Sequence, residues 1–328
     1  MDINYLYHLQ QFRGGPGSLL TSFLTKMTWW GELNTVVLLI AAVYWCVNKE
    51  YGEYLFLGWS GNRLMNGFLK VTACVYRPWI RDARIVPDET AIVTATGYSF
   101  PSGHTMNAAT VFGGSAIRRE FGRGLRILMW LMLFLVAFSR NFLGVHTPQD
   151  VLVGAAAGVL VMFLAGKLMG WVKEHPEKDV WVVAVGIGLA VLLAVYASLK
   201  AYPEDFDAEG QLIVDGAKMA MDTFKGIGYC SAFLTGWILE RRFIRFHTDI
   251  SMKGRVARFA GGMLSYYVVS LILCPPLKEQ IGGAAGTMIS CFIQIFYVVF
   301  LFPLLFMFLE KRAGEAQGNA MSGGGQSR

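Results

Sequence analysis

Three short groups of charged and polar residues interrupt a chain that is 54% hydrophobic and only 16% charged. In chain order they are Lys70 with Arg77-Pro78, then Pro101-Ser102-Gly103-His104, then Ser139-Arg140 with His146 and Asp150. Guanidinium, ammonium, hydroxyl and imidazole groups are the side chains that proteins use to bind a phosphoryl group and to transfer it. Phosphoryl chemistry is therefore the first hypothesis for this chain.

The basic residues and the serine-glycine pair predict a cradle for an anion. Ser102 follows a proline and precedes an apolar segment, so we expect it to cap a helix whose free N–H groups face an anion. Gly103 lets a phosphate approach the backbone closely. Lys70, Arg77 and Arg140 would supply positive charge, and the two arginines can grip phosphate oxygens bidentately. Such a cradle suits the charge that spreads over a phosphoryl group in its transition state.

The two histidines predict opposite chemical roles. Thr147-Pro148 would begin a helix with Thr147 as its N-cap, which places Asp150 in the first turn and within reach of His146. A carboxylate on one imidazole nitrogen fixes the tautomer and leaves the other nitrogen free to attack phosphorus. An imidazole such as that of His104 can be protonated near neutral pH and donate to the leaving oxygen. We expect His146 to be the nucleophile and His104 the general acid.

The elements that would position these groups are transmembrane helices. Apolar residues occur in runs of about 20, which is long enough for a helix to cross a bilayer. A soluble domain of this length would carry roughly 25% charged residues, so this composition excludes one. We expect an all-α, polytopic membrane bundle with about nine transmembrane helices. They are predicted at residues 28–47, 52–73, 102–118, 125–140, 148–167, 179–199, 225–241, 257–275 and 283–309.

The basic residues also predict how these helices are oriented. Successive loops alternate between the membrane sides, and one set of loops, with the tail, holds most of the 29 Lys and Arg residues. Cytoplasmic loops are enriched in Lys and Arg, so we expect this set and the C-terminus to lie in the cytoplasm. The three groups belong to the opposite set and would face outward from the plasma (inner) membrane. The net charge of +6 is explained by this orientation and indicates no nucleic acid.

Together the three groups resemble the signature of the type-2 phosphatidic acid phosphatase superfamily, which also includes the vanadium haloperoxidases. Every signature position is matched within residues 52–170: Lys70, Arg77, Pro78, Pro101, Ser102, Gly103, His104, Ser139, Arg140, His146 and Asp150. The number of spans and the segment Tyr98-Ser99-Phe100 look most like the glucose-6-phosphatase and sphingosine-phosphate phosphatase branch.

The resemblance implies a metal-independent phosphatase that needs no cofactor. It implies that His146 becomes phosphorylated, that His104 is the acid and that Asp150 orients His146. Phosphate binding would fall to Lys70, Arg77, Ser102, Gly103 and Arg140. The site also lacks a carboxylate cluster of the kind that holds a divalent ion, so we expect no metal.

The chain is expected to have four regions. Residues 1–51 would hold an N-terminal segment and the first span, 52–175 the phosphatase core, 176–310 additional transmembrane helices, and 311–328 a disordered cytoplasmic tail. Residues after 175 match no functional motif. Arg63 lies inside the second span, where a charge is costly, so we expect either an internal bond to a polar neighbour or a polar cavity beneath the cradle. The segment 201–224 is either a lid over the site or a plain solvated connection.

Hydrolysis of a lipid phosphate or pyrophosphate is the leading hypothesis, because so much apolar surface around the site suits a lipid substrate. Membrane lipids and a lipid phosphate are then the expected partners. Two other enzyme hypotheses use the same phosphohistidine: hydrolysis of a soluble sugar phosphate such as glucose 6-phosphate, and phosphotransfer to a lipid or glycan acceptor. The alternative outside enzymes is a transporter or scaffold that retains the motifs.

Overall fold

The computed structural model describes residues 2–13 and 18–323, with side chains as far as residue 312. Within these residues the regular elements are all helices, and extended structure is limited to one isolated bridge between Phe206 and Leu212. The all-α prediction is therefore confirmed.

The helices follow one another with short connections, and several contain a π-helical turn. The α-helices are α1 (Asp2–Gln11), α2 (Leu19–Trp29), α3 (Leu33–Ala42), α4 (Lys49–Ala73), α5 (Pro78–Arg81), α6 (Glu89–Ile92), α7 (Gly103–Ala108), α8 (Gly114–Ala116), α9 (Arg123–Phe142), α10 (Pro148–Glu174), α11 (Asp179–Leu199), α12 (Gly216–Leu239), α13 (Met252–Tyr267), α14 (Cys274–Ile281), α15 (Gly283–Phe296) and α16 (Phe302–Gly323). The π-turns are η1 (Val43–Val47), η2 (Ala109–Gly113), η4 (Glu240–Ile244), η5 (Val268–Leu273) and η6 (Tyr297–Leu301), and η3 (Pro176–Lys178) is a 3-10 turn.

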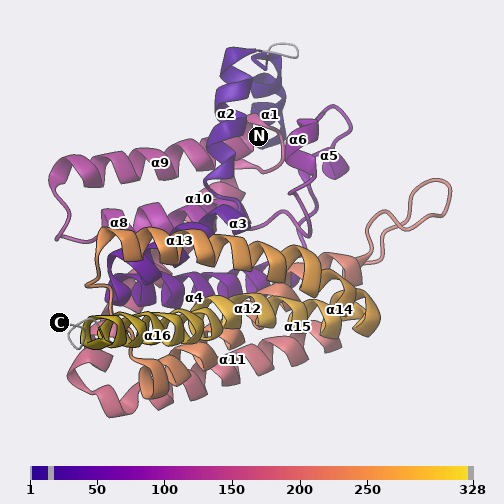
Figure 1. Ribbon diagram of the computed structural model, residues 1–328. Coiled ribbons are helices and arrows are strands. Elements are labelled where there is room, and N and C mark those ends of the chain that lie inside the picture. The colour runs from indigo at the N-terminus through magenta and orange to yellow at the C-terminus, as the bar shows by residue number, and fades with distance from the viewer. Residues whose placement is uncertain (1, 14–17, 324–328) are drawn as a thin grey trace.

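The long helices form a bundle around α4 and α12. In Figure 1 the helices α4, α11, α12, α15 and α16 run side by side across the picture, whereas α2 crosses their direction steeply. The helix α12 packs against α4, α11 and α15, and α4 also packs against α10. Large aromatic side chains fill the centre of the bundle, including the fully buried Trp45, Phe56, Trp59, Phe233 and Trp237. The two halves of the chain therefore share one apolar core.

Fewer helices than predicted meet the length and composition criteria for a membrane span. Among the described residues, five helices are long and apolar enough to cross a membrane, or up to six if the bent pair Leu19–Trp29 and Leu33–Val47 is one span. Helices occur at all nine predicted positions, but a count of nine spans is not confirmed. The helices α4 and α12 do not meet the criterion because charged residues recur along them. Some of these charges, such as Glu53 and Lys70, are buried in the interior of the protein.

The last helix runs into the predicted tail. The helix α16 reaches Gly323 and thus extends into the tail 311–328, for which composition predicts disorder. Its apolar start, Phe302, packs on Trp45 in the core with ring centroids 4.7 Å apart. The last part of the predicted tail, 324–328, lies outside the described residues.

One polar face of α4 ties this helix to the second sequence group. Asn62, Asn66 and Lys70 are buried and recur every four residues, so they lie on the same face of the helix. The Asn62 Nδ2 atom donates to Thr110 Oγ1 at 2.9 Å, and Asn66 Nδ2 donates to the Pro101 carbonyl at 3.1 Å. These bonds hold η2 and the residues just before α7, and with them Ser102 to His104, against α4.

Candidate active site

The third sequence group is organised by the N-terminus of α10. Thr147 caps this helix: its Oγ1 accepts from the Asp150 N–H at 3.4 Å, and Asp150 Oδ2 accepts from the Thr147 N–H at 2.8 Å. Pro148 occupies the first turn, so the predicted cap and proline position are confirmed. This reciprocal capping box fixes the Asp150 carboxylate where the chain enters the helix.

The same carboxylate holds the imidazole of His146. Asp150 Oδ2 lies 3.2 Å from His146 Nδ1 and accepts a hydrogen bond from Ser99 Oγ at 2.6 Å. His146 itself is only 2% exposed. The carboxylate favours the tautomer with its proton on Nδ1, which leaves Nε2 as the nitrogen with a free lone pair. The predicted reach of Asp150 to His146 is therefore present, and Ser99 is a further member that the sequence did not assign.

Arg77 joins the first group to the third. Its Nε donates to the Gly97 carbonyl at 3.0 Å and its NH2 to the Thr96 carbonyl at 2.9 Å. Its NH1 donates to the Val145 carbonyl and lies 3.0 Å from His146 Nε2. Three carbonyl contacts thus hold the guanidinium as a donor to Nε2 of His146, and from this position it can instead donate to an oxygen of a phosphoryl group.

Burial and charge set the protonation of these two loop residues. Burial, followed by the nearby Arg77 charge, lowers the pKa of His146 to about 3 although Asp150 acts to raise it. Burial also lowers the pKa of Arg77 to about 10. At neutral pH the imidazole is therefore uncharged and the guanidinium is cationic, which suits a nucleophile beside an anion-binding group.

Arg140 is buried and His104 is half-buried, and both have inaccessible nitrogens without a hydrogen-bonding partner among the described residues. Arg140 is 0% exposed, and its NH1 donates to Thr28 Oγ1 at 2.7 Å, but its Nε and NH2 have no partner among the described residues. The same holds for His104 Nε2. Leaving a buried donor unsatisfied costs about 1–3 kcal/mol. An anion that accepts from these groups would offset that cost.

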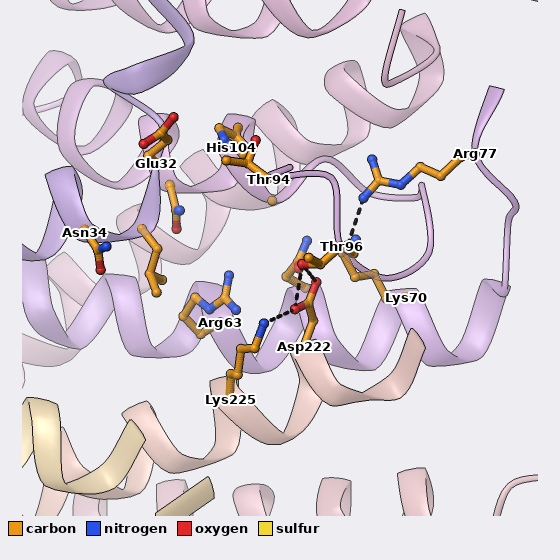
Figure 2. Close-up of a pocket in the computed structure, with 14 residues that line it drawn as sticks. Glu32, Asn34, Arg63, Lys70, Arg77, Thr94, Thr96, His104, Asp222 and Lys225 are labelled. Carbon is orange, nitrogen blue, oxygen red and sulfur yellow. Dashed lines mark hydrogen bonds and ion pairs between the residues drawn. The ribbon is translucent and has the colours of Figure 1, made fainter. Parts of the chain in front are cut away.

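The groups meet at a cavity of about 230 Å³, shown in Figure 2. Lys70, Arg77, Gly103 and His104 line it, and the Lys70 ammonium donates to the Tyr98 carbonyl. Arg140 and His146 lie behind residues of this lining: both interact electrostatically with His104, and His146 contacts Arg77. Ser102 lies beneath as the N-cap of α7, its Oγ accepting from the Thr105 N–H at 3.4 Å. The structure thus brings all eight residues predicted for the site to one place.

Several residues that line the cavity were not predicted as site residues. They are Glu32, Leu33, Asn34, Arg63, Asn66, Thr94, Thr96, Asp222, Lys225 and Asn107. Asp222 accepts from Thr96 Oγ1 at 2.9 Å and from Lys225 Nζ at 2.8 Å. Both of these α12 residues come from the region in which no motif was found. The sequence signal for them is a charged pair three residues apart near a helix start, which is too common to indicate a site.

The segment between α11 and α12 contacts the loops of the site. Tyr76 donates to Asp205 Oδ2 at 2.6 Å. The Tyr98 ring stacks on Tyr76 and on Tyr202, with centroids 6.2 and 6.4 Å away. The segment between α11 and α12 therefore packs against the loop that contains Ser99 and the Thr96 and Gly97 carbonyl groups that accept from Arg77.

A cation-lined cavity beside a histidine–aspartate pair suits phosphoryl chemistry in a helical membrane protein. Residues 51–174 match the PAP2 superfamily, and residues 224–315 match the transmembrane extension of PAP2 superfamily phosphatases. The chain therefore belongs to the PAP2 superfamily, which is the type-2 phosphatidic acid phosphatase superfamily that the motifs predict. It is a phosphatase and an integral membrane protein, as expected from the sequence.

Two curated proteins are similar to parts of the chain. Phosphatidylglycerophosphatase B of Bacillus subtilis (strain 168) is 32% identical over 154 residues, which are 44% of this chain and 71% of the relative. An undecaprenyl-diphosphatase of Sulfolobus acidocaldarius is 36% identical over 70 residues, which are 21% of this chain and 33% of the relative. No solved structure matches the chain.

Proposed function

We propose that the protein hydrolyses a lipid phosphate or diphosphate in this cavity through a phosphohistidine on His146. The observation that carries the proposal is the position of His146: Nδ1 is 3.2 Å from Asp150, and Nε2 is 3.0 Å from the Arg77 guanidinium. The names of the two relatives, a phosphatidylglycerophosphatase and an undecaprenyl-diphosphatase, support a lipid substrate. The apolar helices around the cavity support it too.

The chemistry would proceed in two displacements. In the first, His146 Nε2 attacks phosphorus, the bond to the leaving oxygen breaks, and His104 gives that oxygen a proton. In the second, water attacks the phosphohistidine, His104 takes a proton from that water, and the phosphorus–nitrogen bond breaks to release phosphate. Lys70, Arg77 and Arg140 would stabilise the charge on the phosphoryl oxygens in both steps. Asp150 keeps the imidazole oriented throughout.

The location of the cavity supports a substrate on the non-cytoplasmic side. The cavity lies near the Lys70 end of α4. The basic residues Arg118, Arg241 and Arg242 lie on segments that follow α8 and α12, at the ends of these helices that are farther from the cavity. Cysteines introduced at Ala208 and at Arg119, both exposed, would test this orientation. A membrane-impermeant maleimide added to intact cells should label A208C and not R119C. Equal labelling, or the reverse, would overturn the orientation.

The catalytic proposal is tested with purified protein and a phosphorus-labelled lipid phosphate. We expect an acid-labile phosphoenzyme after a rapid quench, and its loss in His146→Ala together with a fall in turnover of about 10⁴-fold or more. His175→Ala is the matched control, because His175 is only half-buried and caps the far end of α10. Unchanged turnover in His146→Ala would overturn the mechanism.

The same assay separates the alternative substrates. Faster hydrolysis of glucose 6-phosphate than of any lipid phosphate would favour the soluble-substrate hypothesis. Label that moves to a lipid or glycan acceptor without release of free phosphate would favour phosphotransfer. Release of phosphate from a lipid, with neither of these outcomes, is the result we expect.

A further inference from the structure

We propose that Arg63 and Lys225 form a second anionic subsite in the cavity, which binds a second phosphate of the lipid while the terminal phosphate lies at His146. This inference rests on the proposed function and narrows the substrate to lipids with two phosphates. It arises from cationic residues that line the cavity but belong to none of the three sequence groups.

Arg63 is a cation in the middle of α4, and its guanidinium has no hydrogen-bonding partner among the described residues. It is half-buried, and it makes no hydrogen bond or ion pair with any described residue; its Nε is buried and unsatisfied. Arg63 precedes Lys70 by two helical turns, so both side chains project from the same face of α4, about 10 Å apart along its axis. Figure 2 shows both residues extending from α4 toward the cavity. A charge at this depth is retained at a cost unless something pairs with it.

Lys225 brings a second cation to the same level from α12. The backbone of the neighbouring Gly226 packs directly on that of Arg63: a side-chain carbon placed on this glycine would lie 2.9 Å from the Arg63 carbonyl oxygen. Lys225 Nζ is held by Asp222 at 2.8 Å, and Asp222 is anchored in turn to Thr96. The two cations therefore face one cavity from two packed helices.

The acids that line the cavity do not balance its cations. Asp222 interacts with Lys225, Lys70 and Arg63 together, so one carboxylate is shared among three positive side chains. Glu32, the other acid in the lining, interacts with Arg140. Arg77 adds a further positive charge beside His146. One phosphoryl group in the cradle leaves Asp222 as the one acid that Arg63 and Lys225 share, so this part of the lining keeps a positive excess that a second phosphate would offset.

The direction in which a lipid enters predicts where that second phosphate lies. The terminal phosphate of a lipid is the group farthest from its tail, so any other phosphate lies between it and the bilayer. With the terminal phosphate at His146 and Lys70, the next phosphate lies further along α4 toward the bundle centre. Arg63 is placed there. Two chemistries share this feature: a phosphomonoester joined through a short polyol to a phosphodiester, and a diphosphate.

The test compares three lipids in mixed micelles: phosphatidylglycerol phosphate, undecaprenyl diphosphate and phosphatidic acid, which has one phosphate. Arg63→Gln and Lys225→Gln should each lower the ratio of kcat/KM for a two-phosphate lipid to that for phosphatidic acid by about tenfold. The change should be mainly in KM, and Arg63→Lys should restore most of it. Arg119→Gln, an exposed arginine far from the cavity, is the matched control. The two-phosphate lipid whose ratio falls identifies which of the two chemistries binds.

Two results would overturn the subsite. One is an equal loss of kcat/KM on all three lipids, which would mean that Arg63 binds the terminal phosphate or stabilises the fold. A lower melting temperature would indicate that it stabilises the fold. The other is an unchanged ratio in both variants. Failure of the proposed function looks different, because then the unsubstituted protein would hydrolyse none of the three lipids.

Discussion

Buried charges lie at both ends of α4, and they are satisfied in different ways. At the Lys49 end, the Lys49 ammonium lies 2.6 Å from Glu240, and Arg258 lies 2.7 Å from Glu310. At the Lys70 end, Arg140 retains buried donors without a protein partner. The two ends are about 30 Å apart along the helix, close to the thickness of a bilayer core. Charges that pair with one another stabilise the fold, whereas charges left open are available to a ligand.

The paired end is held together by acids that are almost inaccessible to solvent. Asp179 is 0% exposed and accepts from Arg241 at 3.0 Å and from Arg242 at 2.5 Å. This links the start of α11 to the turn η4 that follows α12. Removing one partner of a buried pair typically costs about 3–5 kcal/mol, since the other charge is left uncompensated. At the cavity end, Arg140 makes no ion pair of this kind with any described residue, so removing this cation should change activity more than stability.

The largest expected effect is the loss of activity in Arg140→Met. Without this guanidinium we expect kcat/KM to fall by about 10³-fold, because a donor to the phosphoryl oxygens is lost. The thermal unfolding midpoint in detergent should stay the same or rise, since the unsatisfied donors Nε and NH2 disappear. Phosphate release and a melting curve on the same preparation measure both quantities.

The matched control for Arg140 is Arg258, which is 2% exposed but paired with Glu310. Arg258→Met should show the opposite result, with a lower melting midpoint and nearly full activity per folded molecule. If both variants lost activity and stability together, the contrast between the two ends of α4 would not hold.

The second prediction concerns Asp179→Asn at the paired end. Replacing this carboxylate leaves Arg241 and Arg242 without their shared counter-charge, and we expect the free energy of unfolding to fall by about 3 kcal/mol. The value of kcat should not change, because the site lies at the other end of the bundle. Denaturant unfolding in mixed micelles, followed by tryptophan fluorescence, measures the loss. A lower kcat with unchanged stability would contradict the prediction.

The third prediction is a pH dependence from His146. Its pKa is lowered to about 3 in the folded protein, against about 6.5 for an unperturbed histidine. Between these values the unfolded chain binds the extra proton, so the free energy of unfolding falls as the pH is lowered below about 6.5. At pH 5 the loss amounts to about 2 kcal/mol. His146→Gln should flatten the acid side of the stability curve by this amount, and identical curves for both proteins would argue against a buried neutral imidazole.

What the sequence predicts well is local in the chain. Thr147 and Asp150 form their capping box within one turn, so the contact of Asp150 with His146 follows from spacing alone. Asp222 and Lys225 reach the cavity only because α12 packs on α4, and no spacing within the sequence encodes that contact. The same packing explains why the span count was not confirmed. Both helices carry charges into the interior, which lowers their hydropathy although they lie at predicted positions.

The smallest effect is expected for an ion pair at the same end as Asp179 but on the surface. Lys173 and Glu50 lie 2.9 Å apart, yet their side chains are 71% and 65% exposed. Water screens such a pair and two long side chains must be ordered to form it, so Lys173→Gln should change the free energy of unfolding by no more than about 0.5 kcal/mol. The same denaturant titration used for Asp179→Asn provides the measurement. A loss of unfolding free energy as large as that of Asp179→Asn would contradict this. It would mean that a charge stabilises the fold because of its position along the bundle, and not because it is buried and paired.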